Sequence, residues 1–148
     1  MSLQEQINND IKDAMKAKNS ERLAALRAIK AAIMLEATKK GITSVSDDIS
    51  LDLIIKLVKQ RKDSAQIYKE QNRPDLESDE LKQLKYLEFY LPEQLSNDEI
   101  ETIVNKIIVD NNASSMKDMG RVMGLASKVL SGKADGKLIA QIVKEKLS

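Results

Sequence analysis

The sequence predicts an all-α fold, with a larger N-terminal helical domain of about four helices and a small C-terminal domain of three helices. Apolar residues recur three and four positions apart along almost the whole chain, which is the spacing of one face of an α-helix. No sustained alternation of β-branched and polar residues predicts a strand. Helix-capping sequences separate the periodic segments, so the helices can be placed one by one.

Four helices are expected in the N-terminal domain, which we assign to residues 1–93. Ser2 and Glu5 form a capping box ahead of the first helix, because each side chain can bond the backbone N–H of the other residue. Gly41 is placed to end the second helix, and Pro92 stops the fourth. The expected helices run from Leu3 to about Ala17, from Asn19 or Ser20 to Gly41, from about Ser50 to Asn72 and from Pro74 to Leu91.

Three short helices are expected in the C-terminal domain, residues 96–148. Ser96 with Glu99 is a second capping box, and Asn111 with Asn112 ends the helix that follows it. The expected helices run from Ser96 to about Asp110, from Ser115 to Leu130 and from about Asp135 to Leu147. A unit of this size buries a small core, so we expect it to pack on the first domain or on a partner.

The composition excludes several kinds of chemistry. The chain has no His and no Cys, so it lacks the side chain best suited to proton transfer near neutral pH and the commonest transition-metal ligands. No P-loop, dinucleotide-binding or EF-hand motif occurs. We predict no catalytic residue, no metal and no cofactor. We expect a cytoplasmic location and no membrane contact, because no signal peptide is apparent and the longest apolar run, Ala31–Leu35, is too short for a membrane span.

The formal net charge of +1 conceals three basic segments. Residues 12–40 carry eight Lys or Arg and three acids, residues 56–69 carry five and one, and residues 114–148 carry seven and three. Such zoning can present a basic surface to an anionic partner while the whole chain stays near neutral. The alternative is that solvated helix faces happen to cluster.

Paired carboxylates occur at Asp47–Asp48, Asp79–Glu80 and Asp98–Glu99. Such pairs could serve acid–base chemistry or bind a hard cation. Each pair lies at or near an expected helix start, where negative charge stabilises the helix N-terminus. We therefore interpret all three pairs as structural.

Arg61 lies in the middle of the apolar stripe of the third expected helix. One interpretation is a paired arginine at the edge of the core, with Glu36 or Glu88 as possible partners. The other interpretation is a polar cleft. Its members would be Arg27, Lys59, Arg61 and Tyr68.

The strongest candidate binding surface is on the sixth expected helix. Lys117, Arg121 and Lys128 fall within about 40° of one another on the side opposite its apolar stripe, and no acid lies between them. Gly124 borders this face and Gly120 lies further round, which would let a phosphate backbone approach closely. Lysines opposite a core are expected on any helix, so a merely solvated face is the alternative. The predicted nucleic-acid-binding residues are Lys117, Arg121, Lys128, Lys133 and Lys137.

Several short motifs follow one another in a specific order along the chain. They are Leu26-Arg27 with Lys30 and Glu36, Val58–Ser64 with Tyr68, Arg73 before Leu76, Tyr90–Ser96, Asp118–Gly124 and Gly132–Leu138. In these motifs the chain resembles the GatB/YqeY family over nearly its whole length. Asn72 and Pro74 depart from the family pattern, which affects only the expected shape of that loop.

The resemblance implies an all-α fold and a relation to tRNA. In the fused form of the family, the same module is the tail of the B subunit of the glutamine-dependent aminoacyl-tRNA amidotransferase, where it helps to hold the tRNA body. It can also be appended to a glutaminyl-tRNA synthetase. By analogy, the five predicted cations match the basic end of that tail. The kinase-like core and the Ser-Ser-Lys amidase machinery of the amidotransferase are absent from this chain.

Three functions follow as alternatives. The first is a noncatalytic accessory protein that binds tRNA through backbone phosphates and shape, a mode that needs few aromatic residues. The second is an adaptor that docks on an aminoacyl-tRNA synthetase or amidotransferase through the C-terminal domain. The third, a carbon–nitrogen ligase with glutamine as amido donor, is disfavoured by the missing His, Cys and nucleotide-binding motifs.

Overall fold

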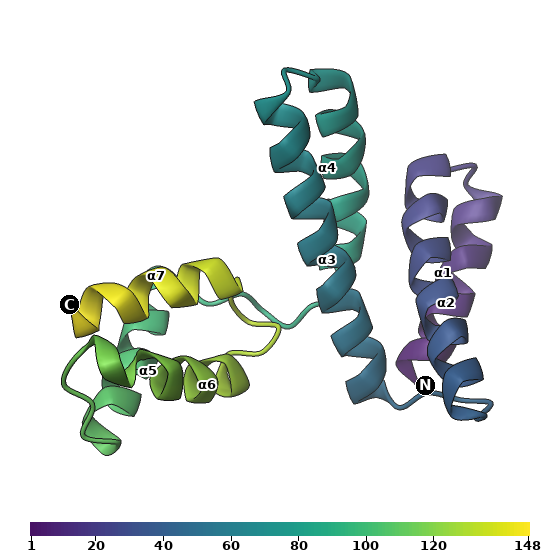
Figure 1. Ribbon diagram of the computed structural model, residues 1–148. Helices are drawn as coiled ribbons and strands as arrows, with labels where there is room; N and C mark the ends of the chain where they lie inside the picture. Colours follow the sequence, from purple (N-terminus) through teal and green to yellow (C-terminus); the bar gives the residue numbers. More distant parts are fainter. The chain divides into compact units, whose positions relative to one another are not determined.

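The chain consists of α-helices, which confirms the all-α prediction. The computed structural model describes all 148 residues and contains seven α-helices, one 3-10 helix and no strand (Figure 1). The helices form two compact units, Met1–Leu91 and Pro92–Ser148. The first unit contains α1 (Leu3–Lys16), α2 (Ser20–Lys40), α3 (Asp47–Glu70) and α4 (Pro74–Glu88). The second contains α5 (Asn97–Asp110), the 3-10 helix η1 (Met116–Asp118), α6 (Met119–Val129) and α7 (Gly136–Leu147).

Side-chain caps fix the limits of the first two helices. The predicted capping box forms, with the Glu5 N–H donating to Ser2 Oγ and the Ser2 N–H donating to Glu5 Oε2, both at 3.1 Å. The Arg22 N–H donates to Asn19 Oδ1 at 3.1 Å, so Asn19 caps α2. Gly41 follows the last residue of α2 with a φ of 65°, a left-handed conformation that glycine adopts at low cost.

Two predicted helix limits in the first unit were wrong. α3 begins at Asp47 rather than near Ser50, because the Ile49 N–H donates to Ser46 Oγ at 3.4 Å and Ser46 acts as the cap. α4 ends at Glu88 rather than running on to Leu91. The proline that follows Leu91 disfavours helical backbone at the residue before it, so the last turn opens early.

The core of the first unit is built from apolar side chains of all four helices. α2 lies in the middle of this core, and its inward residues are at most 1% exposed. Figure 1 shows α1 beside α2 and α3 beside α4. The buried residues are Ile7, Ala14, Ala25, Leu26, Ile29, Ile33, Val45, Ile54, Val58, Leu84 and Leu87. Burial of apolar surface on this scale is the main favourable contribution to folding.

Polar side chains attach the end of α4 to the first two helices. Tyr90 Oη donates to Asp10 Oδ2 at 2.5 Å, and Arg22 Nη2 lies 3.8 Å from the other Asp10 oxygen. Asn19 Nδ2 donates to Tyr86 Oη at 3.3 Å. Burial, followed by the hydrogen bond to Asp10, raises the pKa of the Tyr90 phenol. Tyr90 therefore remains a hydrogen-bond donor at neutral pH.

A second set of contacts joins the start of α1 to the α2–α3 connection. The Leu3 N–H donates to Asp47 Oδ1 at 2.9 Å, and the Val45 N–H donates to Gln4 Oε1 at 3.1 Å. The first N–H groups of a helix have no partner within the helix, so Asp47 satisfies one of them. The Val45 side chain is buried in the same region, so both its backbone and its side chain hold the connection in place.

The second unit has its own core. The predicted Ser96–Glu99 capping box forms, with the Glu99 N–H donating to Ser96 Oγ at 3.2 Å and the Ser96 N–H donating to Glu99 Oε1 at 3.2 Å. The sixth predicted helix is two elements, because the segment after Ser115 winds first as η1 and then as α6. The buried residues are Ile100, Val104, Val122, Ala126, Leu130, Ile139, Ile142, Val143 and Leu147.

Tyr90→Phe is expected to lower the free energy of unfolding by about 1 kcal/mol, because it removes a hydrogen bond to a carboxylate at a half-buried site. Asp10 keeps its contact with Arg22, so no orphaned charge adds to the loss. Urea denaturation of the full chain measures the change. Tyr68→Phe is the matched control, because its hydroxyl forms no hydrogen bond. Equal losses in the two variants would contradict the prediction.

Candidate nucleic-acid interface

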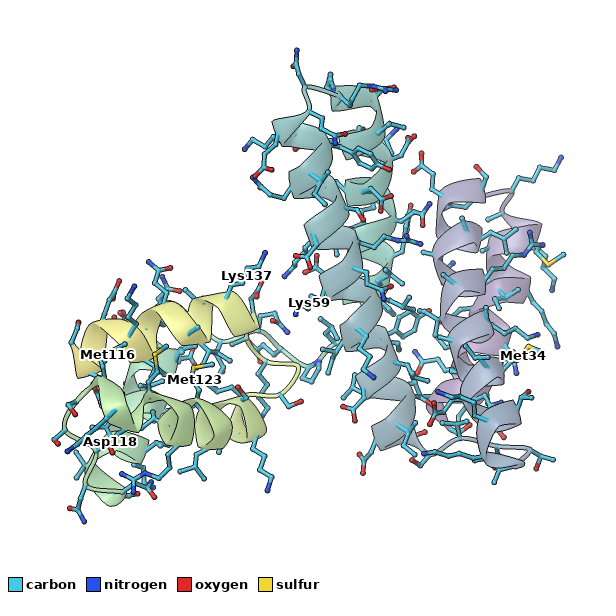
Figure 2. The ribbon with its side chains drawn as sticks, viewed as in Figure 1. Met34, Lys59, Met116, Asp118, Met123 and Lys137 are labelled. Carbon is cyan, nitrogen blue, oxygen red and sulfur yellow. The ribbon has the colours of Figure 1, made fainter.

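The predicted basic face lies on η1 and α6, opposite residues of the core. Val122 and Ala126 are fully buried, whereas Lys117, Arg121 and Lys128 are exposed. Figure 2 labels Met116, Asp118 and Met123 along this segment. Lys117 is on the 3-10 turn and the other two cations are on α6, so helical periodicity relates only Arg121 and Lys128 directly.

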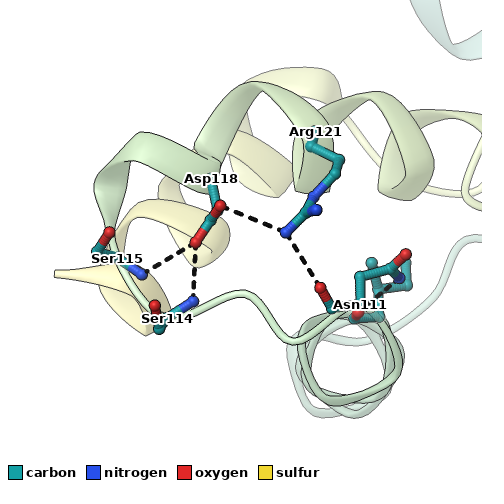
Figure 3. A network of polar contacts seen from close by, with 6 residues as sticks. Asn111, Ser114, Ser115, Asp118 and Arg121 are labelled. Carbon is teal, nitrogen blue, oxygen red and sulfur yellow. Dashed lines mark hydrogen bonds and ion pairs between the residues drawn. The ribbon is translucent and has the colours of Figure 1, made fainter.

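Arg121 is held by its own unit. Its Nη2 donates to Asn111 O at 3.0 Å and lies 3.3 Å from Asp118 Oδ1 (Figure 3). Asp118 Oδ2 accepts from the N–H of Ser114 at 2.9 Å and from that of Ser115 at 3.4 Å. The prediction of an acid-free face was therefore wrong at Arg121. The spacing of three residues between Asp118 and Arg121 was the signal for this pair, while the bond to Asn111 O has no sequence signal.

The same contacts act on the acidity of Asp118. The N–H of Ser114 contributes most, and with the N–H of Ser115 and the positive charge of Arg121 it lowers the pKa of the Asp118 carboxyl from its usual value of 3.8. A lowered pKa keeps this carboxylate ionised well into the acid range. The network therefore stabilises the unit at neutral pH and depends on ionised Asp118.

The other two predicted cations lie where α6 connects to α7. The Lys133 N–H donates to Leu130 O at 2.9 Å, and Lys133 O accepts from the Leu95 N–H at 2.9 Å. These bonds fix the backbone, and the Lys133 side chain is exposed. Lys137 lies in the first turn of α7, as labelled in Figure 2, and its N–H donates to Asp135 Oδ1 at 2.9 Å.

Three of the five predicted cations present unshared charges. Lys117, Lys128 and Lys133 are exposed and form no ion pair. Unpaired lysine side chains on one small unit attract an anionic ligand through charge rather than through a fixed hydrogen-bond geometry. The arrangement provides no proton donor or acceptor that is set up for catalysis.

Two glycines of α6 have no explanation in the packing of the unit. A Cβ at Gly120 or at Gly124 would meet no heavy atom within 4 Å. Neither glycine has a positive φ, so alanine would fit the backbone equally well. A glycine in a helix interior costs about 1 kcal/mol relative to alanine. Both positions therefore leave open space on the outside of the helix at an energetic cost to the fold.

The residues of the predicted polar cleft lie in the first unit. Arg61 Nη1 is 3.6 Å from Glu80 Oε2 of α4, so the partner of Arg61 is Glu80 and the suggested partners Glu36 and Glu88 were wrong. Glu80 had been assigned to a helix start together with Asp79. Both acids lie in the middle of α4 instead, and this placement lets Glu80 reach α3.

The remaining cleft residues are distributed around two helices. Arg27 on α2 and Lys59 on α3 are exposed, and Figure 2 labels Lys59. Lys59 lies about 160° from Arg61 around the axis of α3, whereas Tyr68 is within about 20° of it. The described contacts join Arg61 to Glu80 and do not gather the four residues, so the cleft itself stays a prediction. No three carboxylates gather closely enough to hold a metal ion.

The comparisons with known proteins bear on this site. Residues 4–147 match the family model described as Yqey-like protein. The chain belongs to the YqeY-like family. This membership confirms the resemblance on which the predicted site was partly based.

Relatives of this YqeY-like chain fall into two groups. Altered inheritance of mitochondria protein 41, mitochondrial, from Pyrenophora tritici-repentis is 30% identical over 139 residues, covering 92% of this chain and 76% of the relative. The protein of the same name from Vanderwaltozyma polyspora is 31% identical over 106 residues, covering 70% of this chain and 57% of its own length. A glutamyl-tRNA(Gln) amidotransferase component from Thermococcus gammatolerans is 39% identical over 57 residues, which cover 36% of this chain and 9% of that component.

The location of this YqeY-like protein stays a prediction. None of its helices combines the length and the apolar composition that crossing a bilayer requires. The fungal relatives carry the word mitochondrial in their names, so the expected cytoplasmic location is not confirmed.

Asp118→Asn is expected to flatten the acid side of the pH–stability curve. The folded-state pKa of Asp118 is lowered, so its stabilisation is fully present above the unfolded-state pKa, about 3.9. It is lost as the pH falls through the lowered folded-state pKa. Thermal melting of the parent and the variant between neutral pH and about pH 2 should therefore show the largest difference at neutral pH and convergence in acid. A difference that grows in acid would contradict the assignment.

Proposed function

We propose that this member of the YqeY-like family is a noncatalytic accessory protein that binds tRNA through its backbone phosphates. We further propose that residues 96–148 form the RNA-binding domain and residues 1–93 a separate helical domain. The observation that carries the proposal is the presence of three exposed lysines without ion pairs, Lys117, Lys128 and Lys133, on one small helical unit. Lysines of this kind neutralise phosphates and release their counterions.

The composition of the second unit supports phosphate contact over base recognition. Residues 92–148 contain no Phe, Tyr or Trp, so no aromatic ring can stack on a splayed base there. The unit also lacks a second arginine beside Arg121, and Arg121 already donates to Asn111 O and contacts Asp118. Bidentate recognition of guanine by arginine therefore has no free side chain to use. Contact with the sugar–phosphate backbone is the mode that fits the residues present.

The choice of tRNA among RNAs rests on the relatives. One segment of this chain is 39% identical to part of a protein whose name contains glutamyl-tRNA(Gln) amidotransferase. Because the match covers only 9% of that protein, the reaction of the whole amidotransferase is not proposed for this chain. We propose instead that the shared segment takes part in holding the tRNA.

Replacing Lys117, Lys128 and Lys133 by Ala is expected to weaken binding of a folded tRNA transcript and to flatten its salt dependence. Each lost phosphate contact should reduce the slope of log affinity against log salt by roughly 0.7 to 0.9. The weakening should be similar for several tRNAs, because phosphate contacts position an RNA without reading its bases. Fluorescence anisotropy over a salt series measures both quantities.

The matched control removes the same number of charges from the first unit. Lys12, Lys16 and Lys69 are exposed and form no ion pair, so their replacement by Ala gives the same net charge. This control should bind tRNA like the parent. Unchanged affinity and slope in the second-unit variant, or an equal loss in both variants, would overturn the proposal.

Gly124→Ala is expected to stabilise the protein and to weaken tRNA binding. The added methyl group meets open space in the free protein and gains about 0.5–1 kcal/mol of helix propensity, but it lies about 40° from Lys128 on the helix, where a phosphate backbone would approach. Gly120→Ala is the control, because Gly120 lies about 80° from Lys128 and gives the same stabilisation. Thermal melting and anisotropy separate the two effects, and tighter tRNA binding by Gly124→Ala would contradict the close approach.

A second candidate function, an adaptor for a protein partner, is favoured by apolar side chains on the same unit. Leu125 is 37% exposed and Val129 is 54% exposed, and both adjoin Lys128 on α6. Val109 on α5 is 72% exposed. Exposed apolar residues beside cations are common at protein interfaces. This function becomes the leading one if removal of the three lysines leaves tRNA binding unchanged.

A further inference from the structure

α2 carries apolar residues on the side that faces away from the core. Met34 is 57% exposed and Leu35 is 65% exposed, and Ala24 and Ala31 are exposed as well. Figure 2 labels Met34 on the side of α2 that is turned away from α3. A surface helix of a monomer normally places charged and polar residues on that side. We call these four residues the outer stripe of α2.

The outer stripe is continuous along the helix. At about 100° per residue, Ala24 and Leu35 lie within about 40° of Ala31 and Met34 within about 60°. The buried Ile29 lies about 160° away, so the stripe and the core are on opposite sides. The span from Ala24 to Leu35 is about 17 Å long. The two alanines leave the middle of the stripe low, which allows the backbone of another helix to approach closely.

Cations border the outer stripe on both sides. Arg27 and Lys30 lie along one edge and Lys39 along the other, and all three are exposed and form no ion pair. The acids of α2 are already engaged. Glu36 lies 3.0 Å from Lys40, and Glu21 lies 3.6 Å from Lys82. The surface therefore combines an apolar centre with unpaired positive edges.

We propose that the outer stripe of α2 docks an amphipathic helix of a protein partner whose apolar face is bordered by Asp or Glu. A second copy of this chain fits less well, because any two-fold pairing through the stripe would bring cations towards cations with no unpaired acid between them. An acidic helix supplies the missing charges and covers Met34 and Leu35 at once. This surface belongs to the first unit and is independent of the proposed tRNA site.

The test uses the full chain and a synthetic helical peptide of about 20 residues, with Leu and Ala on one face and Glu along both edges of that face. The parent protein should bind this peptide in a fluorescence anisotropy titration. Met34→Ser with Leu35→Ser should weaken binding by about tenfold or more, as expected for the central apolar residues of an interface. Ile67→Ser on α3 is the matched control, because Ile67 is also exposed, at 51%, and it should bind like the parent.

Charge reversal tests the choice of partner. A peptide with Lys in place of Glu should not bind the parent, but should bind a variant with Arg27→Glu, Lys30→Glu and Lys39→Glu. Circular dichroism should show parental melting for all variants, because the substituted side chains are exposed. The proposal is overturned if the acidic peptide does not bind at about 1 mM or binds equally well after both serine substitutions. It is also overturned if phosphatidylserine vesicles bind through Leu35 while the peptide does not, or if sedimentation shows a dimer that Leu35→Ser dissociates.

Discussion

The Asp118 carboxylate holds together the part of the second unit where α5, η1 and α6 meet. One oxygen accepts two backbone N–H groups from Ser114 and Ser115, and the other contacts Arg121, which in turn donates to Asn111 O at the end of α5. Helix ends leave backbone groups without partners, and this single network satisfies groups at two such ends. As a consequence, Arg121 serves the fold, and the unshared positive charge of the unit is left to its lysines.

The first unit follows the same division between apolar interior and polar ends. Its core side chains are nearly inaccessible to solvent, while the polar contacts of Tyr90, Asp10 and Arg22 lie where the chain leaves α4. Arg61 and Glu80 form a partly exposed pair between α3 and α4. Partly exposed ion pairs contribute little free energy. We therefore attribute the stability of the unit to apolar burial, and to the polar contacts the choice of where its elements meet.

Ion pairing decides which of the many charges are available to a partner. Lys and Arg number 24 in the chain, yet Arg22, Lys40, Arg61 and Arg121 each contact an acid. The charges that are not shared gather in two places with different chemistry. Lysines on a unit without aromatic residues suit a phosphate backbone, whereas cations along the apolar stripe of α2 suit an acidic helix.

The sequence alone determined the all-α fold, the capping boxes at Ser2 and Ser96 and the inward faces of the helices, because hydrogen bonds within a helix and the spacing of apolar residues are local properties. It also determined the family through the order of its motifs. The start of α3 and the two-part winding of η1 and α6 were missed, because several residues compete locally to act as a cap. The tertiary structure decided that Arg61 contacts Glu80 and that Arg121 bonds the Asn111 carbonyl. Partners on other helices or on the backbone leave no spacing in the sequence, so only the packing of helices against one another separates the charges that hold the fold from those that face solvent.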